Sequence, residues 1–259
     1  IVTDHKKAPQ QGKNVTVKGD LGQSAAGKTD KNGELTVPEV EQTERHGVYI
    51  VGYTDGTFGP SRSMTRSEAA AIFARLLAEK NGDTISTAAN TKFADIPAHA
   101  WYSGYVKYLT NNGITYGKSK TIFAPNDAIT RAEFTTMAVR FFDVYGSGDA
   151  EIMEQFSGFN DVSSGYWAAE YIKYAALHGW INGYGDGSFH ADREINRAEV
   201  VTIVNRLLGR EADEDYIADN LRKLNTFPDV SRKHWAYYAV MEAANAHTAV
   251  LGENESWSK

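Results

Sequence analysis

The chain has 259 residues, and its 27 lysine and arginine residues against 33 acidic residues give a formal net charge of −6. This balance argues against nucleic-acid binding through a broad basic face, and no apolar run approaches the ~18 to 20 residues that span a bilayer. The absence of cysteine excludes disulfides, thiolate metal sites and cysteine nucleophiles.

The first 38 residues differ in pattern from the rest of the chain. Val15–Val17 and Glu34–Val37 are strand-like, and Asn32-Gly33 is a turn signal, so we expect a β-hairpin here. The chain opens at Ile1 with neither an initiator methionine nor a signal sequence. We therefore interpret residues 1–38 as the end of an upstream β-rich stalk plus a linker, with any signal peptide upstream.

A phosphate-loop pattern also falls in this segment, at Gly22–Thr29. That motif binds phosphate only where it leads into a helix that aims its N-terminus at the ligand. Here Pro38 follows closely and forbids a helix of useful length. We interpret the match as coincidental.

Two sequence elements then recur three times each, in register. The first is Phe-x-Asp-Ile/Val, with a tryptophan six residues after the aspartate. The second is a glycine-rich loop that carries a tyrosine and closes on a phenylalanine, with an arginine eight residues further on. The recurring residues are Asp95, Asp161 and Asp229; Trp101, Trp167 and Trp235; Tyr53, Tyr116 and Tyr184; and Arg66, Arg131 and Arg197.

Both elements predict helices. Apolar residues follow each tryptophan at helical spacing, and Gly113 and Gly179 are expected to end the first two of these helices. Each arginine lies in a Thr/Asn-Arg-x-Glu tetrad typical of a capping box, with an amphipathic segment behind it. The acidic members of these tetrads are Glu68, Glu133 and Glu199. The sequence thus predicts a mostly α class built from helix-loop-helix repeats.

The order of the halves predicts how the repeats close. The chain begins with a loop-and-arginine half and ends with an aspartate-and-tryptophan half, so the two outer halves lack a partner in sequence. A helix pair cannot bury its apolar faces alone. We therefore expect the helix from Trp235 to His247 to pack against the unit that holds Arg66.

These residues resemble the S-layer homology (SLH) domain, the module that holds surface proteins non-covalently on Gram-positive cell walls. The closest matches to its signatures are Gly52–Phe58, Ile129–Glu133 and His234-Trp235-Ala236. The resemblance covers about residues 39–250. It implies three repeats in a pseudo-threefold arrangement around a central helical bundle, with a short β-rich N-terminal segment before them. It also implies inter-repeat grooves that bind a secondary cell wall polysaccharide, often pyruvylated.

The resemblance divides the chain into three parts. Residues 1–38 precede the SLH domain at 39–250, and residues 251–259 form a C-terminal tail. The SLH domain comprises a half-repeat at 47–80, repeats at 93–145 and 159–209, and a half-repeat at 227–247. We expect a C-terminal wall-anchoring module that is extracellular, in the cell wall or S-layer, with neighbouring surface-protein subunits as further candidate partners.

The candidate ligand-binding residues follow from the chemistry of a pyruvate ketal, which presents a carboxylate. An arginine fork matches a carboxylate, and at the first helical position it would lie beside free backbone N–H groups. We therefore assign Arg66, Arg131 and Arg197 to ligand binding. The three tyrosines are placed for sugar contact. For each of the three tryptophans, packing in the core and stacking on a sugar ring remain equal alternatives. The three aspartates are expected to organise turns, and the three glutamates to cap helices.

The middle loop departs from the family pattern. Lys118-Ser119-Lys120 replaces Asp-Gly, so we expect the groove beside it to differ in charge or to be inactive. We predict no catalytic residue, metal or cofactor, because the chain has no Gly-x-Ser-x-Gly, no His-Glu-x-x-His and no histidine ligand spacing. The alternatives are an assembly module of a surface lattice and, more weakly, a wall-active glycosidase.

Overall fold

The computed structural model describes residues 14–18, 24–28, 42–146, 156–251 and 256–258. The chain divides into two compact units, one of residues 1–44 and 250–252 and the other of residues 45–249 and 253–259. The described residues contain seven α-helices, and the mostly helical class predicted from the repeats is confirmed.

The first unit contains a two-stranded antiparallel sheet. β1 (Asn14–Lys18) pairs with β2 (Ser24–Lys28), with Val15 opposite Gly27. The strand predicted at Val15–Val17 is confirmed, while the partner predicted at 34–37 lies outside the described residues. Lys28 ends a strand rather than opening a helix, as the rejection of the phosphate-loop motif requires.

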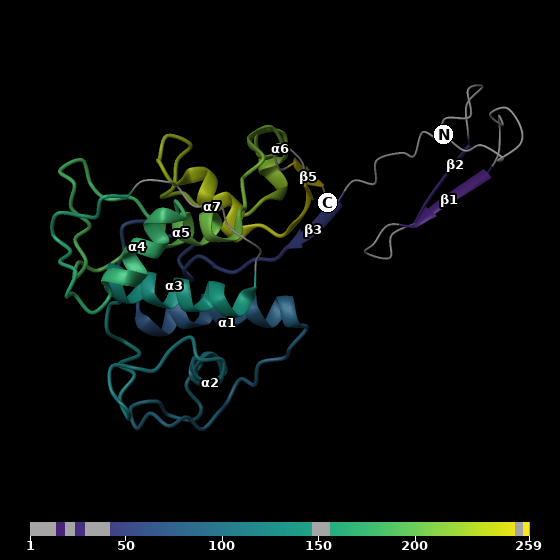
Figure 1. Ribbon diagram of the computed structural model, residues 1–259. Helices are drawn as coiled ribbons and strands as arrows, with labels where there is room; N and C mark the ends of the chain where they lie inside the picture. The colour runs from purple at the N-terminus through teal and green to yellow at the C-terminus, as the bar shows by residue number, and fades with distance from the viewer. Residues whose placement is uncertain (1–13, 19–23, 29–41, 147–155, 252–255, 259) are drawn as a thin grey trace, which may run out of the picture. The chain divides into compact units, whose positions relative to one another are not determined.

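Three long helices build the second unit, and each begins at a tetrad arginine. They are α1 (Arg66–Asn81), α3 (Arg131–Tyr145) and α5 (Arg197–Leu208), and α3 contacts both of the others (Figure 1). All three predicted capping boxes are confirmed. A glycine with positive φ follows each helix, where a left-handed residue satisfies the last carbonyl groups.

Each long helix carries a short one on its outer face. α2 (Ser103–Asn111) packs on α1, α4 (Ala169–Leu177) on α3 and α7 (Tyr237–Ala244) on α5. Each begins two residues after its tryptophan, and the first two end just before Gly113 and Gly179, as predicted.

One expectation about the last helix is wrong, and its expected contact with the first half-repeat is present. α7 ends at Ala244 rather than His247, because Asn245 leaves the helical conformation while its side-chain amide donates to the Met241 carbonyl. The helix with which α7 packs most extensively is α5. The contact with the first half comes from its backbone, since the Tyr49 N–H donates to the Ala243 carbonyl at 3.2 Å.

The segment between the second full repeat and the last half-repeat contains regular structure, and so does the predicted tail. α6 (Glu214–Asn220) and a 3₁₀ turn (Leu221–Lys223) follow α5. β3 (Gln42–His46), β4 (His247–Leu251) and β5 (Ser256–Ser258) form a sheet in the order β3-β4-β5. Trp257 of β5 is buried, which explains why the last residues fold instead of trailing away.

The loops before the three long helices meet in a closed cycle of backbone hydrogen bonds. The Met64 N–H donates to the Ile195 carbonyl, that of Ile195 to Ile129, and that of Ile129 to Met64, at 2.9–3.0 Å. All three side chains are fully buried. The cycle brings the starts of α1, α3 and α5 together.

The recurring aspartates bind the glycine-rich loop in the second half of their own repeat. Asp95 accepts the N–H groups of Phe123 and Ala124, and Asp161 does the same for Phe189 and His190. Their predicted role as acceptors of backbone N–H groups is confirmed, but the loop they hold lies 28 residues further on, not in the turn before their own helix.

Asp229 makes the same contact with the first loop of the chain. Its carboxylate accepts the N–H groups of Phe58 and Gly59 at 2.9 and 2.7 Å. The last half-repeat therefore binds the first in the way that the internal halves bind one another.

Candidate functional site

The three tetrad arginines are buried and span two repeats. The Nε of Arg66, Arg131 and Arg197 donates at 2.8 Å to the carbonyl of Phe123, Phe189 and Phe58, respectively. Their side chains are about 4–6% exposed. Each arginine is thus a tether from the start of one long helix to a neighbouring loop, and only its outer face is open to a ligand.

The expectation of free backbone N–H groups beside these arginines is wrong. The Arg66 N–H donates to the Asp127 carbonyl, the Ser67 N–H to Pro125, and the Glu68 N–H to the Thr65 hydroxyl. The same three positions are occupied at the starts of α3 and α5. Any carboxylate bound here must be recognised by guanidinium groups rather than by a helix terminus.

The glutamates of the capping boxes have a second contact. One carboxylate oxygen of Glu133 accepts the Thr130 N–H, and the other lies 3.1 Å from Arg66 Nη1. Glu199 pairs with Arg131 at 3.1 Å in the same manner, and Glu68 lies 3.8 Å from Arg197. The predicted capping role is therefore confirmed and is joined by ion pairing between repeats.

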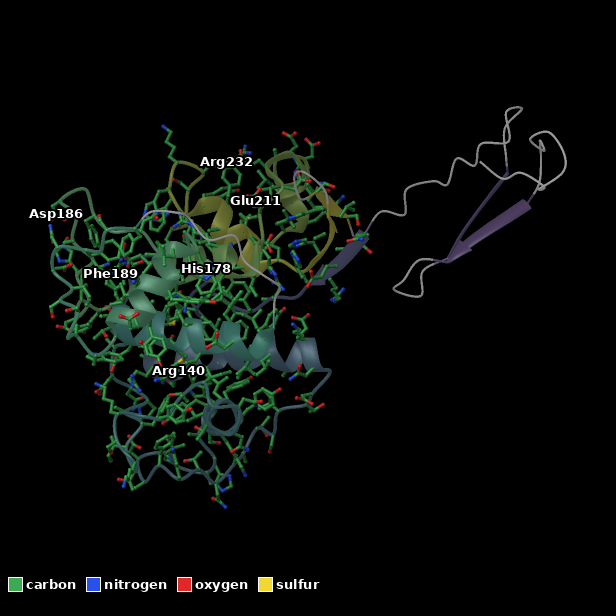
Figure 2. All side chains as sticks on the ribbon, viewed as in Figure 1. Arg140, His178, Asp186, Phe189, Glu211 and Arg232 are labelled. Carbon is green, nitrogen blue, oxygen red and sulfur yellow. The ribbon has the colours of Figure 1, made fainter. Side chains whose placement is uncertain are left out.

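Three cavities surround these ion pairs, and each draws on one recurring set of residues. We name them after the tryptophan at the rim. The Trp101 groove is lined by Arg197, Tyr53, Glu68 and Arg75; the Trp167 groove by Arg66, Tyr116, Glu133 and Arg140; and the Trp235 groove by Arg131, Tyr184, Glu199 and Arg206. Figure 2 shows Arg140 on the outer surface of the helices. The structure thus brings every arginine, tryptophan and tyrosine singled out above into one of three grooves.

The tryptophans are not core residues. Trp101, Trp167 and Trp235 are 54%, 56% and 65% exposed. A large aromatic side chain left half in water beside a cavity offers a flat apolar face at little conformational cost. The geometry favours the ring-stacking interpretation of these three residues over the core-packing one.

A second arginine in each groove was missed in the sequence. Arg75, Arg140 and Arg206 each lie nine residues after the tetrad arginine, on the helix that supplies the glutamate. The constant spacing of nine residues between the two arginines of each helix could have indicated them from the sequence. Each groove therefore has two guanidinium groups and one carboxylate, a local excess of positive charge on a chain of net negative charge.

The tyrosine of the Trp167 groove occupies a different position from the other two. The Tyr53 and Tyr184 N–H groups close their loops on the carbonyls of Thr57 and Ser188, but in the middle loop this bond comes from Lys118. Tyr116 lies two residues before Lys118 in the sequence. This groove is also the smallest, at about 100 Å³ against 280 Å³ for the Trp101 groove and 200 Å³ for the Trp235 groove.

Lys118 also shapes the charge around that groove. Its Nζ pairs with Asp127 at 3.1 Å, while the Ser119 hydroxyl accepts the Ile122 N–H in place of the loop aspartate. In the outer loops that function belongs to Asp55 and Asp186, whose carboxylates accept the N–H groups of Thr57 and Ser188. Figure 2 shows Asp186 at the periphery of the fold. These aspartates therefore form turns, as the sequence suggested.

Burial and neighbouring tyrosines change the pKa of two of the tetrad arginines. Burial lowers the pKa of Arg131 and of Arg197, and the neighbouring Tyr184 and Tyr53 act in the opposite direction. The Arg197 guanidinium lies 4.7 Å from the Tyr53 ring centre, and that of Arg131 lies 5.2 Å from the Tyr184 ring. Such stacking holds each guanidinium flat between its ring and the cavity.

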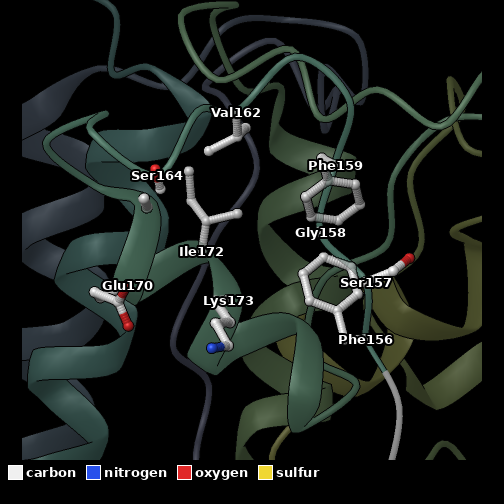
Figure 3. A pocket seen from close by; sticks show the side chains of 10 residues that line it. Phe156, Ser157, Gly158, Phe159, Val162, Ser164, Glu170, Ile172 and Lys173 are labelled. Carbon is white, nitrogen blue, oxygen red and sulfur yellow. The ribbon is translucent and has the colours of Figure 1, made fainter.

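A cavity of about 360 Å³ lies away from the grooves, between α4 and the segment before it (Figure 3). The rings of Phe156 and Phe159 form one wall, opposite Ile172 and Val162. This cavity contains none of the recurring arginines or tryptophans, and no sequence pattern described above indicates it.

Among the described residues, one group of side chains has the composition of a metal site. His46, Glu242 and His247 are buried with their ligand atoms within 4.8 Å of one another. No sequence pattern indicates this group, because 201 residues separate the two histidines. No described helix has the length and apolar character of a membrane span.

Comparison with known proteins gives the same family as the repeats. The model of the S-layer homology domain matches residues 36–70, 92–135 and 158–201. "Cell surface glycoprotein 1" of Acetivibrio thermocellus is 34% identical over 81% of this chain, and "Cellulosome-anchoring protein" of the same organism is 30% identical over 89%. The "Surface-layer 125 kDa protein" of Lysinibacillus sphaericus is 32% identical over 61%. The chain spans 9%, 49% and 13% of these relatives.

Proposed function

Because the chain belongs to the S-layer homology family, we propose that it anchors a surface protein to the bacterial cell wall by binding a wall polysaccharide in its grooves. The observation that carries this proposal is the recurrence of two arginines, a glutamate and an exposed tryptophan around three separate cavities. Core packing does not explain a tryptophan that is exposed to solvent, and helix capping does not explain two arginines in each groove.

The proposed architecture is a pseudo-threefold ring closed by its two half-repeats, with α1, α3 and α5 at the centre. The backbone cycle of Met64, Ile129 and Ile195 supports it, because each residue gives one bond and accepts one. The contact of Asp229 with the first loop repeats the contacts of Asp95 and Asp161. In this arrangement every groove lies between neighbouring repeats of the domain at 39–250.

The proposed ligand is a polysaccharide that carries a carboxylate, such as a pyruvate ketal. The paired arginines, for example Arg197 and Arg75, would bind the carboxylate, and Trp101 and Tyr53 would stack on or border the sugar ring. The other two grooves repeat these roles. Asp95, Asp161 and Asp229 support the loops, and the three capping glutamates hold the tetrad arginines in place.

Three grooves on one polymer would give avidity without tight single sites. The Trp101 and Trp235 grooves share the same tyrosine position, so we assign them the larger share of binding. The Trp167 groove, with Lys118 in that position and the smallest volume, is assigned a minor share. In this proposal the chain is not itself an enzyme, and the surface protein that it carries lies outside it.

Sedimentation with purified bacterial walls tests the proposal. We expect the chain to pellet with walls that bear a pyruvylated secondary polymer and to stay in the supernatant once that polymer is extracted. The Trp101→Ala/Trp235→Ala double variant should lose most binding while keeping its unfolding midpoint. Val144→Ala, which trims an exposed apolar side chain outside the grooves, is the matched control.

Three other results would redirect the assignment. Equal pelleting with extracted and intact walls would overturn polysaccharide anchoring. No pelleting with either wall, together with self-association of the chain, would favour the lattice-assembly alternative. Release of reducing sugar from the walls by the chain would favour the glycosidase.

A further inference from the structure

A cluster of buried ligand atoms lies where the two ends of the repeat domain meet. His46 ends β3, Glu242 lies on α7, and His247 begins β4. The side chains of His46, Glu242 and His247 are 4%, 0% and 3% exposed. The cluster lies outside all three grooves, so its function is independent of what the grooves bind.

The spacing of the ligand atoms is that of a coordination sphere. His46 Nδ1 lies 3.1 Å from His247 Nε2 and 3.3 Å from Glu242 Oε1, and His247 Nε2 lies 3.4 Å from Glu242 Oε2. Ligand atoms held tetrahedrally at ~2.0–2.2 Å from a zinc ion lie about 3.3–3.5 Å apart. The three side chains would need to move only by tenths of an ångström to share one ion.

Hydrogen bonding fixes the tautomer that a metal requires. His247 Nδ1 lies 3.0 Å from the Asn245 carbonyl, and a carbonyl can only accept, so Nδ1 carries the proton. The Nε2 lone pair therefore points into the cluster. A ligating histidine commonly has this carbonyl partner on its other nitrogen.

Packing holds the His247 ring in this orientation. Trp257 stacks on it with ring centres 3.8 Å apart and planes 13° from parallel. The Trp257 N–H in turn donates to Asp213 at 2.9 Å, and its indole nitrogen to the Glu211 carbonyl. The last strand thus covers the cluster and pins one of its ligands.

Glu242 is the reason to expect a cation. Both of its carboxylate oxygens are buried without a hydrogen-bond donor, and its only ion-pair partners among the described residues are the two histidines. With His46 donating from Nδ1 to His247, neither imidazole hydrogen-bonds the Glu242 carboxylate, and burial of a carboxylate without such partners is unfavourable. A divalent cation would compensate it directly.

We propose that His46, Glu242 and His247 bind one divalent transition-metal ion of the zinc class. The ion links β3, the first strand of the repeat domain, to α7, its last helix. Imidazole ligands favour zinc, cobalt, nickel or copper over calcium or magnesium. For His46 to bind through Nδ1, its ring proton has to lie on Nε2, and the three side chains leave a fourth position for water. Because the ligands are buried, the role is structural.

Metal titration of the full chain after chelator treatment tests this proposal. We expect one zinc ion per chain by elemental analysis, and at free zinc about 100-fold above the dissociation constant a rise in Tm of about 5–10 °C. Cobalt should give the visible absorption of a four-coordinate ion, and calcium should have no effect. These readouts need no variant.

Variants then place the ion. Glu242→Gln keeps the shape and removes the buried charge, so its metal-free form should be at least as stable as the wild type while zinc no longer raises its Tm. His247→Gln should also lose the zinc response, and His99→Gln, at an exposed histidine, should keep it. Wild-type chain without stoichiometric zinc, or a His247→Gln chain stabilised like the wild type, would overturn the proposal.

Discussion

Arg197 and Phe58 lie 139 residues apart, yet the Arg197 Nε donates a 2.8 Å hydrogen bond to the Phe58 carbonyl. The same guanidinium donates to the Val51 carbonyl at 2.6 Å and faces Glu68 across 3.8 Å. An arginine singled out as a ligand contact is therefore also a structural link between the last long helix and the first loop. Its two roles have to be separated by experiment.

We expect Arg197→Ala to destabilise the chain as well as weaken ligand binding. The variant leaves two carbonyl groups and Glu68 without their partner, in a place that is largely closed to water. The loss should be about 2–4 kcal/mol in the free energy of unfolding. Urea denaturation measures it, with Arg232→Ala, at an exposed arginine, as the control that stays within about 0.5 kcal/mol.

This expectation changes how arginine variants should be interpreted. A binding loss in Arg197→Ala counts for the groove only if the folded fraction is unchanged under the assay conditions. If urea denaturation instead gave an unfolding free energy equal to that of the wild type, the tether would be energetically negligible. The exposed tryptophans give a cleaner test of the ligand.

Single tryptophan variants should rank the grooves. Trp101→Ala and Trp235→Ala should each lower wall binding several-fold, and Trp167→Ala should lower it less, because that groove is the smallest and its tyrosine, Tyr116, lies two residues before the loop position of Tyr53 and Tyr184. Since all three side chains are more than half exposed, the unfolding midpoints should move little. Wall binding at a fixed salt concentration gives the ranking, and an equal loss in all three variants would show the grooves to be equivalent.

The repeat units could be read from the sequence because their signals are local. Capping boxes, helical spacing and glycines place α1, α3 and α5 by the chemistry of neighbouring residues. The recurring arginines and tryptophans, which the same spacing picks out, line three cavities of the structure. The missed second arginines, such as Arg140, follow the same local logic and needed only the spacing of nine.

Other features depend on contacts that no local pattern encodes. Tyr116 was aligned with Tyr53 and Tyr184 by its neighbouring glycine, but the backbone bonds of the folded loop give that position to Lys118. Asp95 and Asp161 were placed in the turns before their own helices, but the N–H groups they bind lie in a loop 28 residues further along the chain. The His46–His247 pair, 201 residues apart, exists only once the ends of the repeat domain meet.

The loop glycine Gly183 should not tolerate a side chain. A Cβ at this position would lie 2.5 Å from the Phe159 ring and 2.7 Å from the Ser188 carbonyl, and the latter belongs to the backbone that forms the groove loop. Overpacking of this kind costs about 1–3 kcal/mol. We expect Gly183→Ala to lower the unfolding free energy by that amount in urea.

Gly185, two residues further along the same loop, provides the matched control. A Cβ there meets nothing within 4 Å. Gly185→Ala should therefore fold with wild-type stability. A similar loss in both variants would indicate that loop flexibility, rather than the close approach of Phe159, is the reason for glycine.

The aspartate contacts between the two halves of a repeat should make the fold sensitive to acid. Burial raises the pKa of Asp95 and of Asp161, but the backbone hydrogen bonds from the following loop outweigh it and hold both pKa values below the ordinary range. A carboxyl group with a lower pKa in the folded state stabilises that state above the unfolded pKa of about 4. This contribution is lost as the pH falls through the folded-state values.

The free energy of unfolding, measured in urea from pH 6 to pH 2.5, should thus be flat down to about pH 4.5 and fall steeply below it. The Asp95→Asn/Asp161→Asn double variant should be less stable at pH 6, because an amide group can accept at only one of its two atoms, and its stability should depend less on pH. Asp55 provides the contrast: its side-chain bond to Thr57 lowers its pKa as well, but within a single exposed loop. If Asp55→Asn changed the acid transition as much as the double variant did, local turns rather than contacts between half-repeats would govern it.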